Sequence, residues 1–217
     1  LNGAFDSNDA TDQSIWIYIT SNAQTVKTTV TGLPATYASQ IASETKTIAT
    51  ATDSTYDLPA AIDVPGYKLV VTDAAGNVVK NYTDIMTPAG NAGDVINYTY
   101  AYTALPDSIK VYYTYTDPNT GLVKPVDTKL IGLLNINGHE IKYDAKGAPY
   151  IELTGVTDDK VDLTKLENLT GGYSWDGKAP VVNGKAATST TAVMNADVDD
   201  VVTINFTQQP VIATIYY

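Results

Sequence analysis

The feature that most constrains the fold is an internal repeat with a spacing of 106 residues. The pair Gly66-Tyr67 returns as Gly172-Tyr173, a separation of 106 residues (172 − 66). Asp94-Val95, which opens DVINYTY, returns at the same spacing (200 − 94) as Asp200-Val201, which opens DVVTINF. Because one repeated segment of this length is enough for a small domain, the spacing predicts two tandem units of similar fold.

A second kind of marker is an aromatic strand opening that occurs three times. It reads Trp16-Ile17-Tyr18, Val111-Tyr112-Tyr113 and Ile215-Tyr216-Tyr217, with separations of 95 (111 − 16) and 104 (215 − 111) residues. The first separation is shorter than 106 by 11 residues, which indicates extra residues around 118–125 in the second unit. These markers agree with two units joined near Pro106.

The predicted boundaries place the first unit, the more divergent one, at residues 12–104 and the second at residues 105–209. The remaining segment, 210–217, has two interpretations of comparable weight, the start of a next repeat or a closing strand of the second unit. The chain of 217 residues begins at Leu1 without methionine, so we expect a fragment of a longer protein.

Short runs of β-branched and aromatic residues predict a mostly β fold of antiparallel or mixed sheets. These runs are SIWIYIT, YKLVVTD, DVINYTYAY, IKVYYTYT and VVTINFTQ. Turn signals separate them at residues 73–77, 117–121, 137–138 and 183–184. We expect at most one short helix in each unit, near residues 37–43 in the first and for one or two turns after Asp162 in the second.

Composition excludes several classes of function. The chain carries a formal net charge of −11, and all 13 of its basic residues are lysines. A nucleic-acid-binding protein needs a basic surface and usually arginine, so nucleic acid is not an expected partner. The chain has no cysteine, which excludes disulfides and thiolate chemistry. No apolar stretch approaches the roughly 18–20 residues of a membrane span, so we expect no membrane insertion.

Three elements occur in the same order in both halves. They are an opening strand with an Asp-containing turn (IKVYYTYTDPNTGLV), a Gly-Tyr element (PGYKLVVTDAAGNVV and LTGGYSW) and an Asp-Val strand (DVINYTY and DVVTINF). Together they resemble the mucin-binding-protein repeat of wall-anchored adhesins of lactic acid bacteria, over nearly the whole chain. The resemblance implies α+β or mostly β units related to the ubiquitin-like β-grasp, arranged in tandem beside further repeats of the same chain.

The resemblance also implies a function and a location. It predicts an extracellular, wall-anchored surface protein whose repeats bind host mucin glycoproteins or their glycans weakly and multivalently. Two alternatives stay open: a structural spacer in a surface stalk, or a protein-binding module with immunoglobulin as its partner. Family members are described with both mucus glycoprotein and immunoglobulin ligands.

The candidate ligand-binding residues are Tyr173, Trp175 and Asp176, within the Gly-bounded stretch GYSWDG. An indole ring stacks on the C–H face of a sugar, and a carboxylate accepts hydrogen bonds from sugar hydroxyls. The alternative for Tyr173 is packing in the core.

Catalysis is not expected. His139 is the only histidine, no GxSxG occurs, and a glycosidase carboxylate pair would need a deeper cleft than two small β units provide. We therefore predict neither an enzyme nor a cofactor. Two further hypotheses are calcium binding by the aspartates of NADVDD, against the simpler solvated turn, and an isopeptide bond between Lys110 and Asn205.

Overall fold

The structure is a computed structural model that describes residues 22–50, 54–129, 132–169, 171–196 and 198–209. These residues divide into two compact units. The first comprises the described residues of 1–31, 35–62 and 70–100, and the second comprises residues 32–34, 63–69 and the described residues from 101 onward. The predicted strand at Trp16-Ile17-Tyr18 and the segment 210–217 lie outside the described residues.

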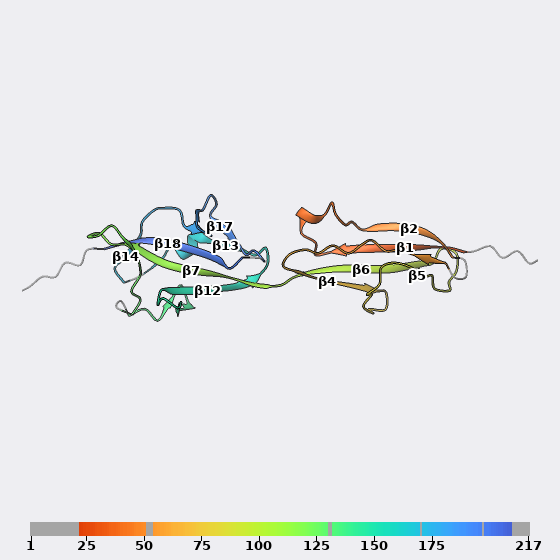
Figure 1. Cartoon of the computed structure of the whole chain (residues 1–217), viewed down its shortest axis with the longest axis horizontal. Helices are drawn as coiled ribbons and strands as arrows, with labels where there is room; N and C mark the ends of the chain where they lie inside the picture. Colours follow the sequence, from red (N-terminus) through yellow and green to blue (C-terminus); the bar gives the residue numbers. More distant parts are fainter. Residues whose placement is uncertain (1–21, 51–53, 130–131, 170, 197, 210–217) are drawn as a thin grey trace, which may run out of the picture. The chain divides into compact units, whose positions relative to one another are not determined.

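The first unit is built on a four-stranded sheet with the order β2-β1-β6-β4 (Figure 1). Strands β1 and β2 are antiparallel, from Asn22 opposite Thr50 to Thr28 opposite Glu44. A separate antiparallel pair joins β3 and β5. The bounds are β1 Asn22–Thr31, β2 Glu44–Thr50, β3 Thr55–Tyr56, β4 Tyr67–Asp73, β5 Ile85–Met86 and β6 Val95–Ala104.

The prediction of a helix near residues 37–43 is wrong. Only a 3-10 turn, η1 (Ala35–Tyr37), forms there, and the chain then turns into β2. The Thr-rich run of β2 is β-branched and pairs along β1, which favours a strand over a short isolated helix. Ser43 lies at the entry to this strand, where its hydroxyl accepts a hydrogen bond from the Val30 amide at 2.9 Å.

Tyrosines fill much of the core of the first unit. Tyr100 is fully buried and its hydroxyl donates to the Pro59 carbonyl at 2.7 Å. The hydroxyls of Tyr56 and Tyr98 lie 2.5 Å apart, and burial raises the pKa of Tyr56. The hydroxyl groups of these buried tyrosines thus form hydrogen bonds inside the unit.

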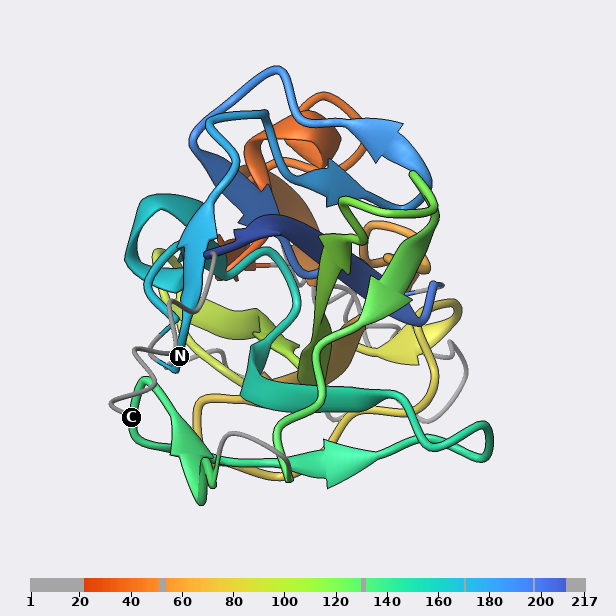
Figure 2. The ribbon, with the colours of Figure 1, turned by 90° about the vertical axis from the view of Figure 1, so that its left-hand side faces the viewer.

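The second unit is built on a larger mixed sheet with the path β11-β12-β7-β18-β15-β16. Strand β18 is parallel to β7 and β12 is antiparallel to it, while β8 pairs with β7 and β14 with β18. Figure 2 shows β18, in dark blue, crossing the middle of this unit. The bounds are β7 Pro106–Thr116, β8 Val123–Pro125, β11 Lys142–Tyr143, β12 Pro149–Val156, β14 Tyr173–Trp175, β15 Val181–Val182, β16 Lys185–Ala186 and β18 Asp200–Gln208.

Smaller elements complete the second unit. Strand β9 (Asn135–Ile136) pairs with β10 (His139–Glu140), and β13 (Lys160–Asp162) pairs with β17 (Thr191–Val193). The 3-10 turn η2 (Leu163–Leu166) follows Asp162, whose side chain accepts from the Thr164 amide, so the predicted start of a short turn at Asp162 is confirmed. Among the described residues of the whole chain, no α-helix occurs.

Alternation along the strands places the core of the second unit. On β7, Ile109, Val111 and Tyr113 point inward, and β18 does the same with alternate residues from Val202 to Phe206.

The mostly β prediction is confirmed, and the two predicted Asn-Gly turns form the β9–β10 and β15–β16 hairpins. Both residues of each turn have positive φ, between 48° and 83°, as a two-residue hairpin turn requires.

The two units share a strand order around their central pair. In the first, β1 and β6 are neighbours, with β2 beside β1 and β4 beside β6. In the second, β7 and β18 are neighbours, with β12 beside β7 and β14 beside β18. Strands β4 and β14 both begin at the tyrosine of a Gly-Tyr pair, and β6 and β18 begin at the Asp-Val markers. The markers at 106-residue spacing therefore open corresponding strands.

In the part of the chain that the structure describes, no helix has the length and apolar character that a membrane span needs.

Candidate ligand-binding groove

An open groove of about 400 Å³ lies beside Trp175 in the second unit. Three segments line it: η2 with its following residue, the end of β14 with the loop after it, and the connection from β16 to β17. We call it the Trp175 groove. Its lining residues are Leu163, Thr164, Glu167, Trp175, Gly177, Ala179, Pro180, Ala187, Thr188, Ser189 and Thr190.

Pairing of β14 with β18 positions Trp175. The register sets Trp175 opposite Phe206, which is fully buried, and Tyr173 opposite Gln208. Tyr173 and Trp175 are two residues apart, so both side chains lie on the same face of the strand. Tyr173 reaches the core, whereas Trp175 lies at its border and is 40% exposed. The indole Nε1 donates to the Lys178 carbonyl at 3.1 Å, which fixes the ring and leaves its apolar surface on the groove.

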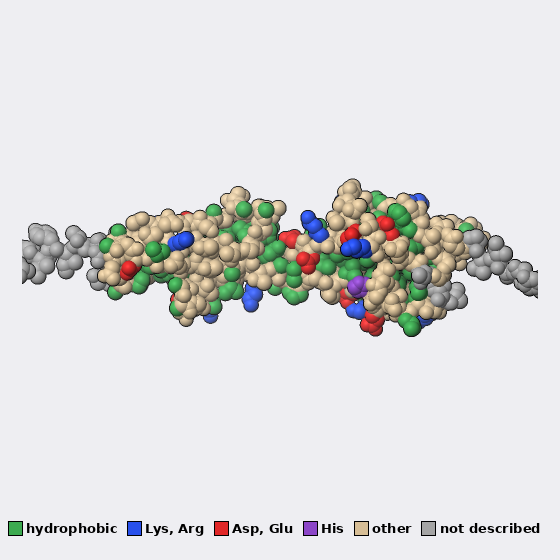
Figure 3. Space-filling view, turned by 180° about the vertical axis from the view of Figure 1, so that it is seen from behind, with side chains coloured by type: hydrophobic (Ala, Val, Ile, Leu, Met, Phe, Trp, Pro, Cys, Tyr) green, Lys and Arg blue, Asp and Glu red, His purple; other side chains and the backbone are tan. Residues whose placement is uncertain are grey.

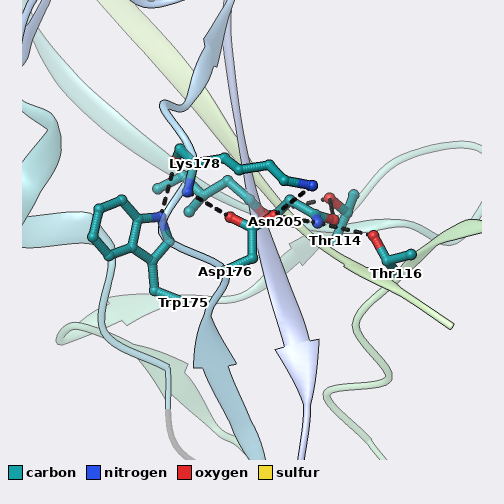
Figure 4. Close-up of polar contacts among 7 residues, drawn as sticks. Thr114, Thr116, Trp175, Asp176, Lys178 and Asn205 are labelled. Carbon is teal, nitrogen blue, oxygen red and sulfur yellow. Dashed lines mark hydrogen bonds and ion pairs between the residues drawn. The ribbon is translucent and has the colours of Figure 1, made fainter. Parts of the chain in front are cut away.

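A polar network beneath the loop holds this arrangement (Figure 4). Asp176 accepts hydrogen bonds from Asn205 Nδ2 at 2.8 Å and from the Lys178 amide at 2.9 Å. Asn205 is held in turn by Thr116 and Thr114, at 3.0 and 3.1 Å. The side chain of Asp176 is only 8% exposed. Its position therefore makes Asp176 a support for the Trp175 loop, and it does not line the groove.

Tyr173 is also a packing residue. It is 8% exposed and its ring meets that of Tyr115 edge-on, with 5.3 Å between the centroids. Burial raises the pKa of Tyr173, partly offset by a hydrogen bond from the Asp127 backbone. Of the three residues predicted to bind ligand, Trp175 alone is an exposed residue of the groove.

The groove combines an aromatic ring with oxygen-bearing groups. Thr188, Ser189 and Thr190 form an exposed run of hydroxyls, and Glu167 contributes the one ionisable side chain of the lining. Burial, and then the negative charge of Asp162, raise the pKa of Glu167. An apolar ring beside hydroxyl and carboxylate oxygens suits a ligand with a C–H face and several hydroxyl groups.

Sequence reasoning missed Glu167 and the hydroxyl run at residues 188–190. No local motif marks them, since they reach the groove only through the pairing of β13 with β17. One backbone contact shows the connection: the Leu163 amide donates to the Thr190 carbonyl at 2.8 Å, which ties the β17 approach to η2.

A second cavity of about 400 Å³ lies elsewhere in the second unit, beside Tyr143. Tyr143 is 42% exposed, and its hydroxyl lies 2.9 Å from that of the buried Thr128. Lys129 Nζ stands 4.8 Å from the centroid of the ring, and Lys124, which forms an ion pair with Asp117, also lines the cavity. Unlike the Trp175 groove, this cavity is flanked by cations.

The remaining candidates occupy structural or surface positions. His139 is exposed on β10, and Figure 3 shows the histidine at the surface. Asp200, proposed as a calcium ligand, is buried and accepts from the side chains of Asn183 and Asn195 at 2.7 and 3.1 Å. Asp197 lies outside the described residues, and among those described no group of three acidic or histidine side chains is placed to hold a metal.

The register also bears on the Lys110–Asn205 isopeptide hypothesis. Strand β18 places Asn205 opposite Thr114, whereas Lys110 lies opposite Val201. Four residues of strand separate the two positions, about 13 Å along the sheet and well beyond the length of a lysine side chain. Because the Asn205 amide is also bonded to Asp176 and Thr116, the structure does not support this cross-link.

The chain matches no protein-family model, and no curated protein matches its sequence. The resemblance to the mucin-binding-protein repeat therefore stays a prediction from the sequence.

Proposed function

We propose that the chain is part of a bacterial cell-surface adhesin whose repeat units bind host mucin glycans weakly and multivalently. The observation that carries the proposal is the Trp175 groove, in which a 40% exposed indole lies beside a run of hydroxyls and a carboxylate. Stacking of an aromatic ring on a sugar, with hydrogen bonds to its hydroxyls, is the interaction that this combination favours.

The protein surface is compatible with such a role. In Figure 3 most of the visible face is tan, the colour of the backbone and of side chains that are neither hydrophobic nor charged, and charged residues make up 17% of the chain. The affinity of one open groove is expected to be low, and tandem units raise it through effective concentration. The proposal places the protein outside the bacterial cell, on its wall, with adjacent repeats of the same chain beside it.

We further propose that each unit belongs to the β-grasp type. Support comes from the shared strand order, with the first and last strands adjacent at the centre of the sheet and the second strand beside the first. The parallel pairing of β7 with β18 in the second unit agrees with this assignment. The absence of an α-helix from the described residues is a departure from the ubiquitin-like arrangement.

The test is binding of the chain to immobilised mucin, before and after periodate oxidation of the glycans. We expect binding that is lost on oxidation and lost in Trp175→Ala. The matched control is Tyr143→Ala, which removes another exposed aromatic ring of the second unit, at 42% exposure, and is expected to bind normally. Melting curves of both variants establish that they are folded.

Two results would contradict the proposal and favour another function. Binding that survives oxidation of the glycans indicates recognition of protein, as an immunoglobulin-binding module would show. No binding to intact mucin indicates a spacer that carries other domains.

A further inference from the structure

We infer that the Trp175 groove is selective for uncharged sugars and that Glu167 sets this selectivity. The inference rests on the proposed function and specifies the class of sugar. Mucin glycans include neutral chains and chains that carry carboxylate or sulfate groups. The question at this groove is therefore which of these two classes it binds more tightly.

The first support is the charge of the lining. Glu167 is the only ionisable residue among the groove residues, and no lysine lines the groove. The nearest lysines in sequence are each associated with an acid: Lys165 Nζ lies 3.8 Å from Asp162 and Lys178 Nζ lies 3.7 Å from Asp176. Within the lining itself, Glu167 therefore contributes the one charge, which is negative. An anionic ligand has no positive partner in the lining.

The second support is hydrogen-bonding capacity. An ionised carboxylate only accepts hydrogen bonds, whereas a hydroxyl both donates and accepts. The hydroxyl groups of an uncharged sugar can donate to Glu167 and exchange bonds with Thr188 and Ser189. A carboxylate or sulfate group on the ligand only accepts hydrogen bonds. Beside the ionised Glu167 it is repelled by the like charge and finds no hydrogen-bond donor on that side chain.

The third support is the contrast with the Tyr143 cavity, of similar volume. There Lys124 and Lys129 are both part of the lining, together with Asp127, and Lys124 forms an ion pair with Asp117. The same unit thus contains a cavity with cations and a groove without them, and the exposed tryptophan belongs to the latter.

The experiment uses O-glycans released from mucin and separated by anion exchange into neutral and acidic fractions. The readout is the NMR resonance of the Trp175 indole N–H in the whole chain, assigned by comparison with Trp175→Phe. We expect the neutral fraction to shift this resonance, and the acidic fraction to act at least about tenfold more weakly. After removal of sialic acid and sulfate, the acidic fraction should shift the Trp175 resonance as the neutral fraction does.

Two variants test the role of Glu167. Glu167→Gln keeps the shape of the side chain and removes its charge, so it should narrow the difference between the fractions. Glu140→Gln is the matched control, because Glu140 is an exposed carboxylate on β10 outside the groove lining, and it should leave the difference unchanged.

The outcomes separate the two proposals. If neither fraction shifts the resonance, the proposed glycan binding at this groove is wrong. If the acidic fraction binds as well as the neutral one, or better, glycan binding stands and the selectivity for uncharged sugars is wrong. If Glu167→Gln leaves a clear preference for neutral glycans unchanged, Glu167 does not set the selectivity.

Discussion

Replacement of Asp176 by alanine tests whether this residue supports the Trp175 loop or contacts ligand. In the structure its carboxylate accepts from Asn205 Nδ2 at 2.8 Å and from the Lys178 amide at 2.9 Å (Figure 4). We expect the alanine variant to be less stable and, because the Trp175 loop loses its anchor, to bind glycans more weakly as well.

The size of the effect follows from the fate of the two donors. A hydrogen bond to a charged group contributes about 1.5–3 kcal/mol to stability. Asn205 Nδ2 keeps its bond to Thr116, and the Lys178 amide can reach water beside an exposed side chain, so both losses lie at the low end. We expect a loss of about 3 kcal/mol in the free energy of unfolding, or roughly 15 °C in the melting temperature of a domain of this size. The ion pair with Lys178 adds little, since that lysine is 79% exposed.

Calorimetry of the thermal transition of the second unit, with glycan binding measured in parallel, provides the assay. Asp176→Asn should lose about half as much stability, because it keeps an acceptor for the Lys178 amide but sets a donor against Asn205. Lys178→Ala is the control and should change stability by less than about 0.5 kcal/mol. The reasoning would be refuted by an Asp176→Asn variant with unchanged stability and abolished binding, which would place the carboxylate on the ligand.

Three further predictions concern the same unit. Tyr173→Phe should cost about 1 kcal/mol of stability, through loss of the hydrogen bond with the Asp127 backbone, and leave glycan binding unchanged; a selective loss of binding would contradict its place in the core. Binding of acidic glycans should rise as the pH falls from about 7 to 4, and less so in Glu167→Gln, because burial and Asp162 raise the pKa of Glu167 and it loses its charge before ordinary glutamates do. Intact mass spectrometry should give the full mass of the chain, without the loss of ammonia that a Lys110–Asn205 isopeptide bond would cause.

The sequence predicts best where a local pattern and the final environment agree. The run YKLVVTD coincides with β4, since its consecutive β-branched residues Val70, Val71 and Thr72 already suit a half-buried strand. Asn183 and Gly184 predict their hairpin because both adopt positive φ, at 48° and 79°. The expected helix at residues 37–43 failed because helix propensity over seven residues is weak against strand pairing that begins at Glu44.

The candidate site was only partly predictable for a different reason. The stretch from Tyr173 to Asp176 reads as one exposed segment, yet its members face different environments: Tyr173 reaches the core, Trp175 lies at its border and Asp176 bonds to Asn205. These differences depend on the register of β14 against β18, which no residue of the stretch encodes. Glu167 lies in the groove because it directly follows η2. Nothing in the sequence between Glu167 and Trp175 indicates that the two side chains line the same groove.

Charge and exposure together bear on the choice between an adhesin and a spacer. With a net charge of −11, the chain is repelled at long range by mucins that carry sialic acid and sulfate, so binding has to come from short-range contacts. A spacer needs only a stable sheet, and a fully buried residue would stabilise position 175 better than an indole that is 40% exposed. The network of Asp176 and Asn205 nevertheless holds that indole in place beside polar groups. An exposed aromatic ring held rigid loses little conformational entropy on stacking, so a weak site of this kind becomes useful when it is repeated along a chain.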